Sequence, residues 1–138
     1  METLYASEVT SQGGLHGHIK SEDGSLDTDV YMPTGEKSDK DKGTTPEQLF
    51  AASYASCLEG TIYHVAKLNN VEINDTKVVA KVQAVEVEKG DLQFKLDLEV
   101  EMPNIDHAKA QHLLNEAYKN CPLTKATQGN MEVNLSLN

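Results

Sequence analysis

Two cysteines are the residues of this chain that could carry covalent chemistry. Cys57 and Cys121 are its only cysteines. In a reducing compartment such a pair is usually inert, metal-binding or redox-active, and it is rarely a structural disulfide. Two thiols alone do not complete a zinc site, which needs further ligands. The cysteine count by itself does not decide between inert and redox-active thiols.

The two cysteines have different local settings. Cys57 falls in the middle of a predicted helix, where most free cysteines are small buried hydrophobic residues. Cys121 precedes Pro122, which favours the first position of a helix, and a thiol at a helix N-terminus has a stabilised thiolate. The local sequence therefore predicts that Cys121 is the more acidic thiol and Cys57 the more buried one. To act as a nucleophile, Cys57 needs a nearby cation that offsets its burial.

Glu47, His16 and His18 are further titratable candidates. Glu47 lies nearly three turns before Cys57 on the predicted helix, where a capping role explains it without any function. His16 and His18 share one face if both lie on a strand. No carboxylate or cysteine with a matching spacing lies near them in the sequence, so we predict no metal site.

The helix that carries Cys57 is predicted over residues 46–68. Thr44 or Thr45 can cap it, Pro46 favours the first turn, and Glu47 or Gln48 can close a capping box. Several small residues follow within this helix: Ala51, Ala52, Ser53, Ala55 and Ser56. Another surface must therefore pack close to it. A subunit of this size can hardly bury both an apolar and a small-residue face, so we expect a homodimer.

Strand patterns flank this helix. A turn at Asp23-Gly24 separates strand-like segments over 15–20 and 26–32. Residues 34–43 are charged and lack apolar side chains, which is typical of a solvated linker.

A second strand region follows the helix. Residues 77–87 are rich in valine, and residues 92–102 alternate apolar and polar side chains as a half-buried antiparallel strand does. A helix begins after Asn104 or Asp106 and runs to about residue 119, and a last strand covers residues 133–137. The order of elements predicts an α+β fold in a single domain over residues 1–138.

The composition excludes several classes of partner. The chain has 138 residues and a formal net charge of -10, which disfavours nucleic acid and anionic membrane surfaces as partners. No stretch approaches the roughly 20 apolar residues that span a bilayer, and the N-terminus lacks a secretory pattern. We therefore predict a cytoplasmic protein that needs no cofactor.

Two motifs resemble a known family. Residues 45–57, Thr-Pro-Glu-Gln-Leu-Phe-Ala-Ala-Ser-Tyr-Ala-Ser-Cys, resemble the central helix of the OsmC/Ohr family, most closely its organic hydroperoxide resistance branch. Residues 121–130, Cys-Pro-Leu-Thr-Lys-Ala-Thr-Gln-Gly-Asn, resemble the second cysteine segment of that branch. The motifs occur in the family order and separation. The resemblance implies an OsmC-like α+β fold, with antiparallel sheets around a long central helix, in an intertwined homodimer with two sites at its interface.

The resemblance also implies roles for the site residues. Cys57 would attack the terminal oxygen of an organic hydroperoxide and become a sulfenic acid. Cys121 would resolve it as a disulfide, which a dithiol or lipoyl-type reductant would reduce, and Glu47 would orient the activating cation. The family thus assigns the nucleophile to Cys57, although the local sequence favours Cys121 as the more acidic thiol. We follow the family.

One part of the family pattern is missing. The family places an arginine after a Gly-Gly pair near the N-terminus, whereas here an apolar residue follows Gly13-Gly14 and the chain has no arginine. Lysine does not replace its bidentate geometry. His16, His18 or Lys20 could supply the cation, and we favour one of the histidines, which would make thiolate formation sensitive to pH. Otherwise Cys57 is less activated, or the chain has lost peroxidase chemistry.

Apolar residues near the motifs indicate the substrate class. Leu15, Phe50, Tyr54 and Leu58 would favour alkyl or lipid hydroperoxides over hydrogen peroxide. Two further functions are open. One is a redox-inert OsmC-like protein that binds a small molecule, which the missing arginine supports and the cysteine pair opposes. The second is a general thiol redox sensor, which would react with disulfides and hydrogen peroxide equally well.

Overall fold

The computed structural model of this chain describes residues 1–34 and 43–138. It divides into two units, residues 1–49 and residues 50–138, and each is described by itself. The linker predicted over 34–43 lies, apart from its two ends, outside the described residues. The single domain predicted over 1–138 stays a prediction. No helix among the described residues is long and apolar enough to cross a membrane.

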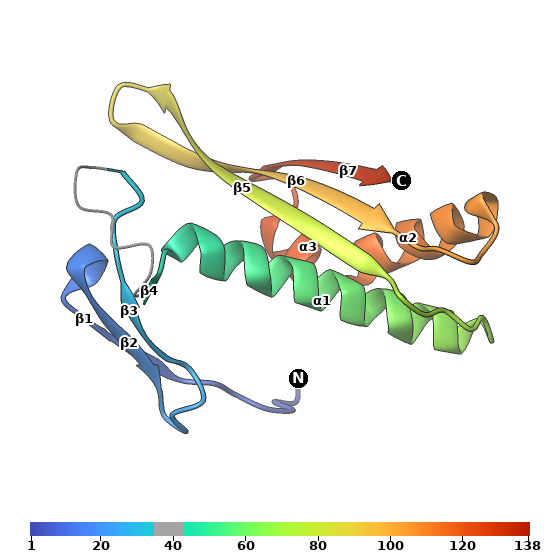
Figure 1. Cartoon of the computed structure of the whole chain (residues 1–138), viewed down its shortest axis with the longest axis horizontal. Helices are drawn as coiled ribbons and strands as arrows, with labels where there is room; N and C mark the ends of the chain where they lie inside the picture. The colour runs from blue at the N-terminus through green and yellow to red at the C-terminus, as the bar shows by residue number, and fades with distance from the viewer. Residues whose placement is uncertain (35–42) are drawn as a thin grey trace. The chain divides into compact units, whose positions relative to one another are not determined.

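The first unit contains a four-stranded sheet with the order β1-β2-β3-β4 (Figure 1). Its elements are β1 (Val9–Gln12), the 3-10 helix η1 (Gly14–His16), β2 (Gly17–Ser21), β3 (Asp27–Val30) and β4 (Gly43–Thr44). The hairpin predicted around Asp23-Gly24 is confirmed as the antiparallel pair β2–β3. Ile19 and Val30 are the buried apolar side chains of this sheet.

A tight turn at η1 joins β1 to β2. Gly13 has a φ of 87°, a left-handed conformation that glycine adopts without a steric penalty. At Gly17 an added Cβ would lie 1.9 Å from the backbone oxygen of Gln12, so only glycine fits there. This turn places Leu15 and His16 in an exposed 3-10 helix, so His16 does not share a strand with His18.

The long helix α1 (Pro46–Leu68) has the bounds predicted from the sequence. Thr45 is its cap, because the backbone N–H of Gln48 donates to Thr45 Oγ1 at 3.1 Å. The side chain of Gln48 bonds the hydroxyl of Thr44 at 2.9 Å. The helix ends at Leu68, and Asn70 follows with a φ of 56°, the left-handed conformation common at helix ends.

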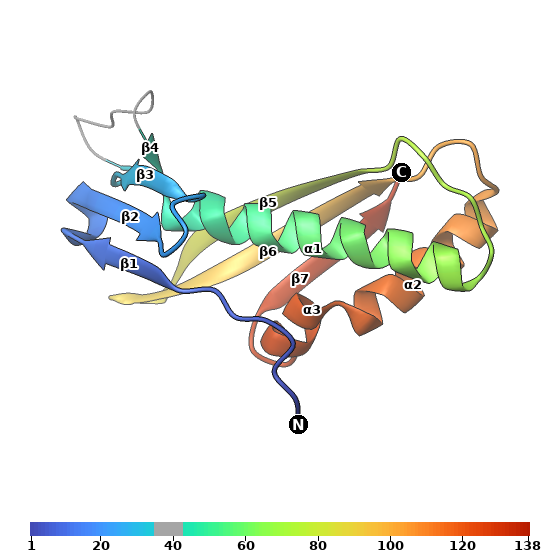
Figure 2. The same cartoon turned by 90° about the horizontal axis from the view of Figure 1, so that it is seen from below.

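The second unit is a three-stranded sheet with helices on one face (Figures 1 and 2). It contains residues 50–68 of α1 and the elements β5 (Lys77–Glu88), β6 (Asp91–Glu101), α2 (His107–Asn120), α3 (Pro122–Thr127) and β7 (Glu132–Leu137). Asp106 caps α2, since its carboxylate accepts a hydrogen bond from the backbone N–H of Lys109 at 3.2 Å. The predicted hairpin β5–β6, the second helix and the last strand are all confirmed.

The core of this unit lies between the sheet and α1 and α2. Leu96, Leu98 and Val100 of β6 are at most 1% exposed, and they belong to one cluster with the buried faces of the two helices. The other face of the sheet carries charged pairs such as Lys95 and Glu132 at 3.5 Å, together with the exposed Val79 of β5. One face is therefore buried and the other solvated, as the strict alternation along β6 predicts.

The prediction of antiparallel sheets is wrong for one pair of strands in each unit. β3 and β4 are parallel, and so are β6 and β7. The reason in the second unit is the connection: a parallel return needs a long crossover, and α2 and α3 provide it between β6 and β7. Both sheets are therefore mixed.

Candidate active site

The two cysteines meet at the point where α3 approaches α1. Cys57 is half-buried on α1, and Cys121 is fully buried at the junction of α2 and α3. Both are free thiols, and Cys121 lies near enough to raise the pKa of the Cys57 thiol. As predicted, Cys121 occupies the N-cap position of α3 and Pro122 is the first helical residue. Two neighbouring free thiols have the chemistry needed to form a disulfide.

The first turn of α3 acts on Cys57. Burial raises the pKa of the Cys57 thiol above its ordinary value, and the neighbouring Cys121 raises it further. A hydrogen bond from the backbone N–H of Leu123 acts in the opposite direction and lowers the pKa. The sequence could not indicate this amide, because a backbone group has no residue-type signal. Within its own unit, the Cys57 thiol therefore has a pKa above its ordinary value.

Glu47 has an unsatisfied carboxylate. It lies in the first turn of α1, where the helix dipole favours a negative charge. Its Oε2 atom is buried and has no hydrogen-bond partner among the described residues. A buried carboxylate oxygen in this state is stabilised by a donor or a cation that reaches it from elsewhere.

His18 lies between two aspartates on the neighbouring strand. Its Nδ1 is 2.6 Å from Asp29 Oδ1, and its Nε2 bonds Asp27. The hydrogen bond to Asp29, followed by that to Asp27, raises the pKa of His18 above its ordinary value. Residue counting across the Asp23-Gly24 turn could have found this pairing, since His18 stands opposite Asp29. The described residues contain no group of His, Cys, Asp and Glu side chains suited to a metal ion.

The apolar candidates are distributed over three environments. Leu15 is 38% exposed on η1, and Tyr54 and Leu58 are fully buried in the core. Phe50 lines a hollow of about 470 Å³, together with Leu92, Gln93, Phe94, Ala126, Thr127, Asn130 and Met131. The rings of Phe50 and Phe94 lie with centroids 5.7 Å apart. Sequence reasoning missed Phe94, because it lies on a strand far from Phe50 along the chain.

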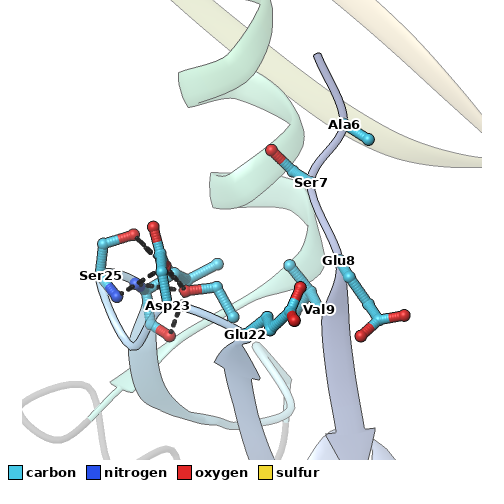
Figure 3. A pocket seen from close by; sticks show the side chains of 9 residues that line it. Ala6, Ser7, Glu8, Val9, Glu22, Asp23 and Ser25 are labelled. Carbon is cyan, nitrogen blue, oxygen red and sulfur yellow. Dashed lines mark hydrogen bonds between the residues drawn. The ribbon is translucent and has the colours of Figure 1, made fainter. Parts of the chain in front are cut away.

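A second hollow, of about 540 Å³, lies in the first unit at the β2–β3 turn (Figure 3). The carboxylate of Asp23 points at the turn and accepts hydrogen bonds from Ser21 Oγ at 2.7 Å and from the backbone N–H and Oγ of Ser25. The bond from Ser21, followed by those from Ser25, lowers the pKa of Asp23 to about 2. These groups satisfy one another and shape the turn, and no cysteine lines the hollow. The thiol pair is the better candidate for chemistry.

The fold and this pair define a small α+β protein with a two-thiol site, and comparisons place it among known proteins. The family model described as OsmC-like protein matches residues 38–136. The organic hydroperoxide resistance protein OhrB of Bacillus subtilis (strain 168) is 44% identical over 135 residues, which cover 97% of this chain and 98% of that protein.

Solved structures agree with the sequence match. The crystal structure of OhrB of Bacillus subtilis has a TM-score of 0.87 at 42% identity and covers 99% of this chain and 100% of its own. An organic hydroperoxide resistance protein from Elizabethkingia anophelis, crystallised with thiocyanate bound, has a TM-score of 0.91 at 35% identity. The match covers 100% of this chain and 99% of that protein's chain. The chain therefore belongs to the OsmC-like family, in its organic hydroperoxide resistance branch.

Proposed function

We propose that this protein is a thiol peroxidase that reduces organic hydroperoxides to alcohols. The observation that carries the proposal is that two free cysteines, Cys57 and Cys121, are near enough for Cys121 to raise the pKa of the Cys57 thiol, which offers one sulfur to react with peroxide and a second to resolve the product. The names of the relatives, organic hydroperoxide resistance proteins, support the same substrate class.

The proposed reaction has two steps before reduction. The Cys57 thiolate attacks the terminal peroxide oxygen, so that an S–O bond forms, the O–O bond breaks and the alcohol leaves after protonation. Cys57 is now a sulfenic acid, oxidised by two electrons at the expense of the peroxide. Cys121 then attacks this sulfur, the S–O bond breaks and water leaves, and a Cys57–Cys121 disulfide remains. An external dithiol, such as a lipoyl-type dithiol, restores both thiols by exchange.

Activation of Cys57 is proposed to depend on a cation near Glu47. The buried, unpartnered oxygen of Glu47 among the described residues supports this, because such a group binds and orients a positive side chain. His18 is bound to two aspartates, which offset its charge. His16 is exposed on η1 with no side-chain hydrogen bond among the described residues. We therefore favour His16 over His18 as the cation, with Lys20 as the other basic residue of this region.

The substrate is proposed to be an alkyl or lipid hydroperoxide. The hollow beside α3 supports this, because Phe50, Leu92, Phe94 and Met131 contribute apolar side chains to a lining that is otherwise partly polar. Such a surface adds binding energy for an alkyl group and none for hydrogen peroxide.

The working form is proposed to be a homodimer. One face of α1 carries the small residues Ala52, Ser53, Ser56 and Gly60, all of them exposed on the chain. Small residues allow another backbone to approach closely, and the described part of the chain leaves this face uncovered. Sedimentation at micromolar concentration tests the dimer, and a clean monomer would remove it.

The function is tested by peroxide consumption with dithiothreitol as the reductant. Cumene hydroperoxide and hydrogen peroxide are compared for wild type, Cys57→Ser and Cys121→Ser. We expect fast loss of cumene hydroperoxide, slow loss of hydrogen peroxide, and no turnover in Cys57→Ser. Equal rates for the two peroxides would favour a general redox sensor instead.

A redox-inert binding protein is the second candidate. The raised pKa of Cys57 favours it, as does the lack of an arginine in the chain. Absence of turnover with either peroxide would move this function to first place.

A further inference from the structure

The hydroxyls of Tyr54 on α1 and Thr124 on α3 form a hydrogen bond inside the second unit. Tyr54 Oη and Thr124 Oγ1 are 2.7 Å apart, although the residues are 70 positions apart in the sequence. The two residues are 0% and 7% exposed, respectively. A buried hydroxyl without a partner is unfavourable, so each group holds the other in place.

This hydrogen bond lies next to the thiol pair. Tyr54 is three residues before Cys57 on α1, and Thr124 is three residues after Cys121 on α3. Along α1 the order is Tyr54 and then Cys57, whereas along the second segment the order is Cys121 and then Thr124. The two segments therefore run antiparallel where these two pairs of residues lie side by side. The first pair is joined by the hydrogen bond between the Tyr54 and Thr124 hydroxyls, and the second pair consists of Cys57 and the neighbouring Cys121, which raises its pKa.

Tyr54 also lies near Tyr118, a residue of α2 that precedes Cys121 in the sequence. Tyr118 is three residues before Cys121, and its backbone oxygen accepts a hydrogen bond from the Cys121 N–H at 3.4 Å. Burial, followed by the nearby Tyr54 hydroxyl, raises the pKa of Tyr118 to about 12. The hydroxyl of Tyr54 thus faces two residues that flank Cys121, one in α2 and one in α3.

We propose that Tyr54 is a positioning residue for Cys121, because its hydroxyl holds the segment that carries Cys121 where the thiol can attack oxidised Cys57. The inference rests on the proposed function and extends it to the second step. In that step the S–S bond forms, the S–O bond of the Cys57 sulfenic acid breaks, and the departing hydroxide is protonated to water. Tyr54 is fully buried in the core and does not line the hollow that contains Phe50, contrary to its expected place in the substrate pocket, so we expect the first step to be nearly independent of its hydroxyl.

The first experiment separates the two steps in the full-length reduced protein. One equivalent of cumene hydroperoxide is added to wild type, Tyr54→Phe and Thr124→Val, and peroxide loss, sulfenic acid trapped by dimedone, and disulfide are followed. We expect peroxide loss within about twofold of wild type, and disulfide formation slower by roughly tenfold to a hundredfold, since small misplacements of reacting groups have effects of this size. Trapped sulfenic acid on Cys57 should increase in parallel.

Two variants serve as controls for this experiment. Thr124→Ser keeps the hydroxyl and should restore fast disulfide formation. Tyr63→Phe removes a tyrosine hydroxyl from the same helix at a residue that is 42% exposed, and it should match wild type. Disulfide formation as fast as wild type in Tyr54→Phe, or an equal slowing of both steps, would overturn the inference.

The second experiment needs no peroxide. The Cys57–Cys121 disulfide is equilibrated with mixtures of reduced and oxidised dithiothreitol, and the ratio of the two forms is measured by alkylation and mass spectrometry. We expect Tyr54→Phe and Thr124→Val to shift the equilibrium toward the dithiol by roughly tenfold, and Tyr63→Phe not to shift it. An unshifted equilibrium contradicts the positioning role. A shifted equilibrium in a protein that consumes no peroxide would retain the positioning role and reject the peroxidase.

Discussion

The backbone N–H of Leu123, in the first turn of α3, lies near enough to the thiol of Cys57 on α1 to favour its thiolate. This amide lowers the pKa of the thiol, whereas burial and the neighbouring Cys121 raise it, and the raising effects dominate. The pKa of Cys57 should therefore respond to the loss of Cys121. Removing Cys121 takes away two of the raising contributions and leaves the amide in place.

We therefore expect Cys121→Ala to lower the pKa of Cys57 relative to wild type, so that thiolate forms at a lower pH. The measurement is alkylation of Cys57 by iodoacetamide across a pH series, with the modified peptide quantified by mass spectrometry so that the reaction of Cys57 is followed separately from that of Cys121. Cys121→Ser, which keeps a hydrogen-bonding group, should change the midpoint less. A midpoint that stays or rises in Cys121→Ala contradicts the prediction.

The second prediction concerns the stability contributed by His18. Its folded-state pKa lies above the ordinary value of 6.5, because Asp29 and Asp27 both accept from the ring. The contribution is therefore fully present below pH 6.5 and is lost as the pH rises through the folded-state pKa. Thermal unfolding of wild type and His18→Gln should show a difference that is largest in acid and disappears in alkali. The difference should collapse when Asp27 and Asp29 are both replaced by asparagine.

The third prediction concerns the start of α1. Thr45 is 4% exposed and its hydroxyl accepts the N–H of Gln48, so Thr45→Ala should lower the free energy of unfolding by about 1 kcal/mol. Thr44→Ala is the matched control, because the Thr44 hydroxyl bonds only the side chain of Gln48 and the backbone of Thr45 among the described residues. Urea unfolding of the reduced proteins gives both values. An equal loss in the two variants would show that the cap assignment is wrong.

The parts of this molecule that the sequence predicts are those with local signals. Thr45 and Pro46 mark the start of α1, and the alternation along β6 marks a strand with one buried face. Pro122 marks the start of α3 and so places Cys121 at its N-cap. The two cysteine motifs indicate the family, because each is a run of specific residues rather than a composition.

The features that the sequence does not predict depend on residues that are close in space but distant along the chain. A period of two says nothing about strand direction, so the parallel pairs β3–β4 and β6–β7 have no signal in the alternation. Nothing in the type of Tyr54 or Thr124 indicates a bond across 70 positions, and the apolar character of Tyr54 points instead to the substrate site. The local pattern around Glu47 likewise does not indicate that one of its oxygens is buried without a partner among the described residues.

The last prediction tests that carboxylate. Glu47 has a buried oxygen without a partner among the described residues, so this oxygen is free to accept a hydrogen bond from a cation beside it. Glu47→Gln should therefore preserve the free energy of unfolding and slow the reaction of Cys57 with cumene hydroperoxide by roughly tenfold or more, since a misplaced cation leaves less thiolate. Glu59→Gln is the control on the same helix, where Glu59 accepts from Thr76 Oγ1 at 2.8 Å. If the two variants react equally fast, Glu47 has no part in activating Cys57, and the cation must be sought elsewhere.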